Sequence, residues 1–179
     1  MKWPPLPKKR YQIIYADPPW FYTRQQHTKT KASGGAETHY PTLTLQQLKK
    51  FPIQQLIDWS GCLLFLWATG PRLDWAVDLL RYWKFYYKTV AFVWDKGKPN
   101  PGYYTMSQCE YVLLGKIGKI PTPRGARNLR QLVRWPKQEH SKKPLAVRSR
   151  ITEMFPTQTK IELFARERYE GWDAWGLEV

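Results

Sequence analysis

Apolar residues gather in short runs along this chain, and polar or turn-forming residues separate the runs. Five of the runs are rich in β-branched and aromatic side chains and have the length of a buried strand. These predicted strands cover residues 11–16, 62–68, 86–94, 110–114 and 160–165. Apolar residues also recur at three- and four-residue steps after Pro71 and after Pro144, which predicts two amphipathic helices. Strands and helices that alternate in this way indicate an α/β fold.

The connections between these elements carry signals of their own. No helical pattern separates 86–94 from 110–114, so these two strands are predicted to pair as an antiparallel hairpin. The segment between them, 95–104, is rich in glycine and proline and is predicted to be a loop. Prolines also mark 116–150 as mostly loop, and 171–179 is predicted to be a short aromatic tail.

The length and the cysteine content limit the class of protein. The chain has 179 residues, from which we predict a basic, proline-rich arm over residues 1–10 and one domain over residues 11–179. Cys62 and Cys109 cannot form a disulfide framework, and Cys62 lies in a buried run, so we expect a reducing, cytoplasmic environment. No apolar run is long enough to cross a membrane, and no apolar segment of a secretory signal follows the basic N-terminus.

The charge of the chain points to its partner. The net charge is +15, which is typical of proteins that bind a polyanion such as nucleic acid, although a solubilising surface is the ordinary alternative. Residues 116–150 carry eleven Lys and Arg against one acid. The predicted nucleic-acid contacts are Lys116, Lys119, Arg124, Arg127 and Arg130 of this stretch, with Tyr22, Arg24, His39 and Tyr40 of the long polar loop 21–42.

The first strand ends in the sequence Asp17-Pro18-Pro19-Trp20, which we interpret as a receptor for an amino-bearing planar ring. Two prolines cannot donate to a strand ladder, so a stiff turn follows the strand. In open α/β sheets, ligands bind at the carboxyl ends of the strands. Asp17 and the carbonyl of Pro18 could accept hydrogen bonds from the exocyclic amine of adenine, Pro19 would orient that carbonyl, and Trp20 could stack on the ring. The alternative is an ordinary turn.

An amine held in this way suits N-methylation. The lone pair of the adenine N6 is delocalised into the ring, and two acceptors would favour a localised lone pair. The donor would be a sulfonium held in line, so positioning carries much of the catalysis and no metal is needed. The three histidines show no metal-ligand spacing with one another or with the cysteines.

Two further groups of residues have a functional and an ordinary interpretation. Glu162, Phe164 and Arg166 alternate along the last strand, where they could either line a site or form the solvated face of an edge strand. Ser141 and Lys143 precede the helix that begins at Pro144, so the lysine could bind an anion beside the helix N–H groups, or the segment could simply start the helix.

Taken together, these segments resemble the N6-adenine methyltransferase family typified by the catalytic subunit of the mRNA adenosine methyltransferase, and in particular its small bacterial and phage members. The motifs that carry the resemblance follow one another in a fixed order. They are Tyr15-Ala16-Asp17-Pro18-Pro19-Trp20, His39-Tyr40-Pro41-Thr42, Leu64-Phe65-Leu66-Trp67, Phe92-Val93-Trp94, Gly102-Tyr103-Tyr104-Thr105 before Glu110, His140-Ser141-Lys142-Lys143-Pro144, Lys160-Ile161-Glu162-Leu163-Phe164-Ala165-Arg166, and Gly171-Trp172-Asp173-Ala174-Trp175-Gly176.

The resemblance implies a class I, Rossmann-like methyltransferase fold with helices on both faces of the sheet, and S-adenosylmethionine as the methyl donor. It implies that Asp17 contacts the target amine and the donor's ammonium, that Lys143 meets the donor's carboxylate, and that Arg166 meets its ribose. The backbone of 162–165, which includes Glu162 and Phe164, would line the same site. This chain has Leu177 where the family commonly has Asn, and Glu178 supplies a polar partner beside it.

Three hypotheses follow for the function. The first is a DNA adenine N6-methyltransferase of a bacterial or phage-infected cell, and the second is an RNA adenosine N6-methyltransferase with the same chemistry. The third is a catalytically silent nucleic-acid-binding partner of a methyltransferase, for which Leu177 is the one supporting feature. The sequence leaves open whether the chain acts alone, as a homodimer or in a heterodimer.

Overall fold

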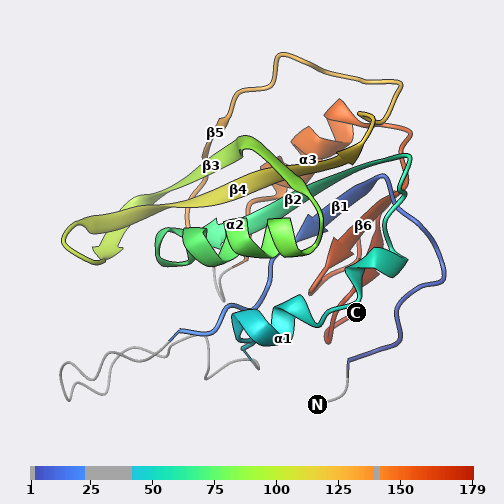
Figure 1. Cartoon of the computed structure of the whole chain (residues 1–179). Helices are drawn as coiled ribbons and strands as arrows, with labels where there is room; N and C mark the ends of the chain where they lie inside the picture. Colours follow the sequence, from blue (N-terminus) through green and yellow to red (C-terminus); the bar gives the residue numbers. More distant parts are fainter. Residues whose placement is uncertain (1–2, 23–41, 139–141) are drawn as a thin grey trace.

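Within the residues that the computed structural model describes, 3–22, 42–138 and 142–179, seven strands form one sheet (Figure 1). The order across the sheet is β5-β3-β4-β2-β1-β6-β7. The strands are β1 (Ile13–Ala16), β2 (Gly61–Thr69), β3 (Tyr86–Pro101), β4 (Met106–Gly118), β5 (Leu132–Arg134), β6 (Lys160–Leu163) and β7 (Asp173–Trp175).

Strand β4 is antiparallel to both of its neighbours, β2 and β3, whereas the other pairs of adjacent strands are parallel. The predicted antiparallel hairpin of β3 and β4 is therefore confirmed. Strand β1 lies between β2 and β6, so the chain leaves β1 toward one side of the sheet and returns to its other side much later. This reversal of strand order opens a crevice at the carboxyl ends of β1 and β6, where open α/β sheets bind their ligands.

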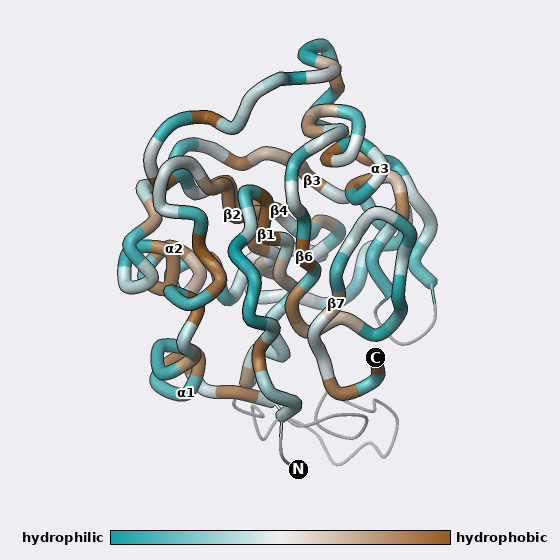
Figure 2. The backbone as a smooth tube through the Cα atoms, turned by 90° about the vertical axis from the view of Figure 1, so that its right-hand side faces the viewer, coloured by the Kyte–Doolittle hydropathy of each residue, from teal (hydrophilic) through white to brown (hydrophobic). Residues whose placement is uncertain are grey.

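Helices cover both faces of the sheet, as expected. Helix α1 (Leu45–Lys49) and helix α2 (Leu73–Tyr82) pack on one face, and helix α3 (Leu145–Met154) packs on the other. Two short 3-10 helices, η2 (Ile53–Gln55) and η3 (Gly70–Arg72), flank β2. Figure 2 shows the hydrophobic segments gathered toward the middle of the molecule, where β1, β2 and β4 lie.

The local sequence explains how the helices begin and why they dock. Thr44 and Gln47 form a reciprocal capping box at the start of α1. Pro144 precedes α3 as its N-cap residue, in agreement with the prediction. Val147 and Ile151 of α3 are four residues apart and both fully buried. Burial of each side chain contributes about 1.5–3 kcal/mol of hydrophobic free energy, which holds α3 against the sheet.

The predicted loop 95–104 is partly wrong, because β3 continues through Pro101. The side chain of Asp95 accepts hydrogen bonds from the backbone N–H of Gly97 at 2.9 Å and from Gln108 of β4 at 2.7 Å, which keeps the two strands together. Strand β5 pairs with β3 only up to Asp95, so beyond that point the outer side of β3 is a free edge. Prolines are tolerated at such an edge because no neighbour requires their N–H groups.

Among the described residues, the prediction that 116–150 are mostly loop is confirmed. The short strand β5 within them was not predicted, because three residues are too few for a period-two pattern and only Val133 of the three is buried. One further sequence interpretation needs correction. The predicted aromatic tail 171–179 contains β7, which pairs with β6. Strand β6 is therefore an inner strand, and the interpretation of its charges as those of an edge strand is wrong.

Cys62 is buried and unpaired in β2, as predicted, and Cys109 is half-buried and also free. In the parts of the chain that the structure describes, no helix is long and apolar enough to cross a membrane.

Candidate active site at the carboxyl ends of the strands

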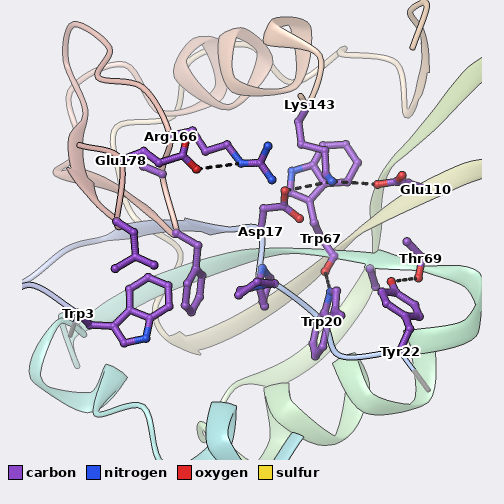
Figure 3. Close-up of a pocket in the computed structure, with 16 residues that line it drawn as sticks. Trp3, Asp17, Trp20, Tyr22, Trp67, Thr69, Glu110, Lys143, Arg166 and Glu178 are labelled. Atoms are coloured by element: carbon purple, nitrogen blue, oxygen red, sulfur yellow. Dashed lines mark hydrogen bonds and ion pairs between the residues drawn. The ribbon is translucent and has the colours of Figure 1, made fainter. Parts of the chain in front are cut away.

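A pocket lies in the crevice at the carboxyl ends of β1, β2 and β6 (Figure 3). The space within it is about 800 Å³, counting the part that is open to solvent. The residues that line it are Trp3, Asp17, Pro18, Pro19, Trp20, Tyr22, Trp67, Ala68, Thr69, Glu110, Lys143, Phe164, Ala165, Arg166, Leu177 and Glu178.

The turn after β1 is held by hydrogen bonds of its own backbone. The N–H of Trp20 donates to the carbonyl of Pro18 at 2.8 Å, and the N–H of Leu43 donates to the carbonyl of Pro19 at 2.7 Å. The indole Nε1 of Trp20 donates to the carbonyl of Trp67 at 3.1 Å, and the Trp20 ring is almost fully buried. Trp20 thus fixes the turn more than it offers an open stacking face. A carbonyl has two lone pairs, so that of Pro18 can accept one more bond.

A chain of ion pairs runs from Lys96 of β3 to the turn after β1, and Figure 3 shows its part from Glu110 to Asp17. Lys143 Nζ lies 3.0 Å from Asp17 Oδ2 and 3.1 Å from Glu110 Oε2, so one ammonium bridges two carboxylates. Glu110 Oε1 also lies 3.4 Å from Lys96 Nζ. The ammonium of Lys143 lies 5.3 Å from the centre of the Trp67 ring, which adds a cation–π contact. These contacts hold the Asp17 carboxylate in one position.

The surroundings shift the pKa of each group in this chain. Burial raises the pKa of Asp17 above its ordinary value, because lost hydration outweighs the attraction of Lys143. Burial would also raise the pKa of Glu110, but Lys143 and Lys96 lower it below its ordinary value. Burial alone would lower the pKa of Lys143, but the two carboxylates raise it well above its usual range. Lys143 therefore stays charged, and Asp17 is the carboxylate of this ion-pair chain whose pKa is raised.

Aromatic rings form the opposite wall of the pocket. Trp3 stacks on Trp175 with ring centres 4.9 Å apart and meets Phe164 edge-on at 5.5 Å. Phe164 has a positive φ of 61°, a conformation that is unfavourable for a residue with a Cβ and that occurs mainly where surrounding contacts impose it. A Cβ on Gly176 would lie 2.0 Å from the carbonyl oxygen of Ala165, so only glycine permits this approach of the two segments.

Polar groups flank this aromatic wall on both sides. The Arg166 guanidinium Nε lies 3.7 Å from Glu178 Oε1. Toward β2, the hydroxyl groups of Tyr22 and Thr69 share a hydrogen bond of 2.7 Å. The guanidinium of Arg72 lies 4.6 Å from the centre of the Tyr22 ring and fixes its plane. The pocket thus has an aromatic end and a charged end, with Asp17 at the charged end.

The structure brings half of the predicted site residues together in the pocket. Those that line the pocket are Asp17, Pro18, Pro19, Trp20, Tyr22, Lys143, Phe164, Arg166 and Glu178. Glu162 is not among the lining residues; its side chain forms an ion pair with Arg148 of α3. Arg24, His39 and Tyr40, and with them the motif at 39–42 apart from Thr42, lie outside the described residues, as do His140 and Ser141.

Sequence reasoning did not assign four pocket residues that contribute side chains, namely Trp3, Trp67, Thr69 and Glu110. For Glu110 a signal existed, since it is an acid at the start of a predicted apolar strand, five residues after the end of the Gly102-Tyr103-Tyr104-Thr105 motif. Trp3 had no such signal, because it lies in an arm without regular structure. Its packing against Phe164 and Trp175 brings it to the pocket.

The basic stretch does not surround the pocket. Lys116 pairs with Leu63 near the start of β2, whereas Glu110 pairs with Thr69 at its end, so Lys116 and Lys119 lie at the opposite end of the sheet. At about 3.4 Å per residue, the six steps from Glu110 to Lys116 span about 20 Å. The other three predicted contacts lie on the loop that follows. There the guanidinium of Arg124 packs over the Phe155 ring at 5.4 Å, and Arg127 and Arg130 are exposed.

Comparison with known proteins adds to this geometry. The MT-A70 family profile matches residues 11–178. The type II methyltransferase M.MunI of a Mycoplasma species is 50% identical over 189 residues, which cover 98% of this chain and 81% of that protein. The N(6)-adenine-specific methyltransferase METTL4 of Mus musculus is 28% identical, covering 96% of this chain and 38% of its own length. An MT-A70-like N(6)-adenosine-methyltransferase of Arabidopsis thaliana is 24% identical, with 94% and 24% covered.

Proposed function

This chain belongs to the MT-A70 family, and we propose that it transfers a methyl group from S-adenosylmethionine to the exocyclic N6 of adenine in DNA. It is a methyltransferase of the class I fold, with one antiparallel strand in an otherwise parallel sheet. The observation that carries the proposal is the position of Asp17. This carboxylate lies in the pocket directly after β1, and Pro18 lines the same pocket.

These two acceptors match the two N–H bonds of the target amine. The N6 lone pair of adenine is delocalised into the ring, so the amine is a poor nucleophile. Hydrogen bonds to Asp17 and to the free lone pair of the Pro18 carbonyl would draw the amine toward a pyramidal shape, with its lone pair directed at the donor. The bonded network around the turn holds both acceptors in place before the substrate arrives, which is a form of preorganisation.

The remaining residues of the pocket fit S-adenosylmethionine. When bound, this donor supplies an electrophilic methyl group on a sulfonium. Trp3 and Phe164 offer aromatic faces for the adenosine, and Arg166 and Glu178 offer polar partners for its hydroxyl groups and ring nitrogens. Lys143 has three N–H bonds, of which two point to carboxylates, so the third is available to the donor's carboxylate. Asp17 would also face the donor's ammonium.

The relatives support the choice of polymer and of base. M.MunI is named as a type II methyltransferase, the class that acts on DNA, and it matches nearly the whole of this chain. The mouse relative is named for its action on the N6 of adenine. RNA remains the second candidate, because the plant relative is named as an adenosine methyltransferase. The catalytically silent alternative, for which Leu177 was the one supporting feature, is not favoured, because Asp17-Pro18-Pro19-Trp20 is intact and lines the pocket.

A methyl-transfer assay tests the proposal directly. DNA free of methylated adenine and RNA of matched sequence are incubated with labelled S-adenosylmethionine, and N6-methyladenine is measured by mass spectrometry of the nucleosides. We expect methylation of DNA, and a loss of about a hundredfold or more in kcat for Asp17→Asn. Asp74→Asn, at an exposed acid of α2, is the matched control. Preferred methylation of RNA, or full activity of Asp17→Asn, would contradict the proposal.

A further inference from the structure

The β3–β4 hairpin extends beyond the sheet at the same end as the pocket (Figure 1). Its tip, defined here as residues 96–106, follows directly on the part of β3 that pairs with β5, and is exposed from Gly97 onward. Glu110 of the pocket lies on β4 four residues after Met106, a distance of about 14 Å along an antiparallel strand. The tip therefore stands at the rim of the pocket and reaches past it.

Large side chains at the tip are turned into solvent. Tyr103 is 58% exposed, Met106 is 59% exposed, and Tyr104 has no contact that reduces its exposure at all. Tyr104 also has a φ of 62°, the left-handed region that residues with a Cβ rarely adopt. A residue held in an unfavourable conformation with its ring fully in solvent contributes nothing evident to the fold, and such strain is found mainly at functional sites.

The charge of the tip indicates the chemistry of its partner. Residues 96–106 contain Lys96, which pairs with Glu110, and the exposed Lys98, and they contain no acid. Flat rings beside cations suit a nucleic acid, because lysines bind phosphate groups and aromatic rings stack on bases of any sequence. The hairpin beneath the tip is braced by the two hydrogen bonds to Asp95, so the tip has a defined position relative to the pocket.

We propose that the β3–β4 tip binds the nucleic-acid strand beside the target adenine, with Tyr103 and Tyr104 stacked on bases and Lys98 on a phosphate. This inference rests on the proposed function and names an element that would engage the same substrate. An adenine must leave the base stack before its N6 can reach Asp17, and the neighbouring bases then lose a stacking partner. The exposed rings of the tip replace that partner.

Binding measurements with labelled duplex DNA test the tip separately from the chemistry. Tyr104→Gly removes the ring and also relieves the unfavourable φ, so loss of stability cannot explain its effect. We expect its DNA affinity, measured by fluorescence anisotropy, to fall about 5- to 100-fold, while Tyr104→Phe retains affinity. Tyr86→Ala is the matched control, because Tyr86 is 74% exposed at the opposite end of the same strand.

The lysine of the tip has its own readout. Lys98→Ala should lower the slope of log affinity against log salt concentration by about 0.9, the value for one phosphate contact. Lys88→Ala, at an exposed position of β3 far from the pocket, should leave the slope unchanged. An adenine analogue with fluorescence sensitive to stacking, placed next to the target site, should change its emission with wild type and not with Tyr104→Gly.

The outcomes separate the tip from the reaction. If wild type methylates DNA and both tip variants bind DNA as wild type does, the inference is overturned and the proposed function stands. If Tyr104→Gly weakens binding and wild type methylates neither polymer, the proposed function fails and the tip remains a nucleic-acid contact. If the tip variants change the molar mass in light scattering and leave DNA affinity unchanged, the tip binds a second copy of the chain and the inference is overturned.

Discussion

Replacement of Glu110 by Gln should move the pH dependence of methyl transfer in a direction that the ion-pair chain dictates. In the proposed function the ionised Asp17 is the stronger acceptor for the target amine, so kcat/KM should fall as the pH drops through the pKa of Asp17. The negative charge of Glu110 raises that pKa. Glu110→Gln removes the charge, keeps an oxygen that accepts from Lys143, and leaves Lys143 with Asp17 as its one carboxylate partner in this chain of ion pairs. The acidic limb should therefore shift to lower pH.

The structure gives the size of this shift. The Asp17 and Glu110 oxygens lie 3.0 and 3.1 Å from the same Nζ, so they are at most about 6.1 Å apart. At an effective permittivity of about 20, two unit charges at that distance repel by about 2.7 kcal/mol. This energy corresponds to about two pKa units. A quarter of the Asp17 side chain is exposed, and solvent screening there reduces the expected shift to about one unit.

The assay is kcat/KM for methyl transfer to DNA, measured from pH 5 to pH 9 in buffers of constant ionic strength. Lys143→Met is the opposing variant, because loss of the ammonium should move the acidic limb to higher pH. Glu153→Gln, at an exposed acid of α3, should leave the limb in place. If the acidic limb of the pH profile stays in place or moves to higher pH in Glu110→Gln, the ion-pair chain does not set the charge of Asp17 as argued.

Three other predictions follow from the structure. Burial raises the pKa of Glu162 to about 7, so the folded state binds this proton more tightly than the unfolded state does. The free energy of unfolding should therefore fall as the pH rises from about 4.5 to about 7, by at most about 3 kcal/mol. In urea titrations, Glu162→Gln should make the free energy of unfolding less dependent on pH over this range. Trp3→Ala should weaken the affinity for S-adenosylmethionine about tenfold in calorimetry, because an aromatic face of the pocket is lost, and unchanged affinity would remove Trp3 from the donor site. Gly176→Ala should lower the melting temperature by several degrees, because its Cβ would lie 2.0 Å from the carbonyl oxygen of Ala165. Gly70→Ala is the control and should leave the melting temperature unchanged, because a Cβ there meets nothing within 4 Å.

The sequence predicted those parts of the molecule whose signals are local. The apolar run before Asp17 and the two prolines after it are enough to predict a strand that ends at a ligand site. The proline before α3 and the apolar residues that follow it define the helix that Lys143 precedes. The β3–β4 pairing was also predicted from a local signal, because no helical pattern separates the apolar runs 86–94 and 110–114.

Long-range register determines the remainder, and composition does not reveal it. Glu110 reaches the pocket because antiparallel pairing sets it opposite Thr69. The same strand then runs away from the pocket, so Lys116 and Lys119 arrive at the far end although they belong to the basic stretch. A count of charges cannot distinguish these ends, because the direction of β4 depends on its partner in the sheet. Trp3 is a comparable case, since its neighbours Phe164 and Trp175 are remote in sequence.

The position of β1 between β2 and β6 also has a consequence for biosynthesis. During translation β1 leaves the ribosome well before residues 160–163, which form β6, one of its two neighbours. Until then the nascent chain carries an unpaired apolar edge beside β1, which is the kind of edge that favours aggregation. The pocket cannot exist before β6 docks, because its Asp17 side and its Phe164 side face each other across that junction. Capture of the methyl donor would thus report that the sheet has closed around its first strand.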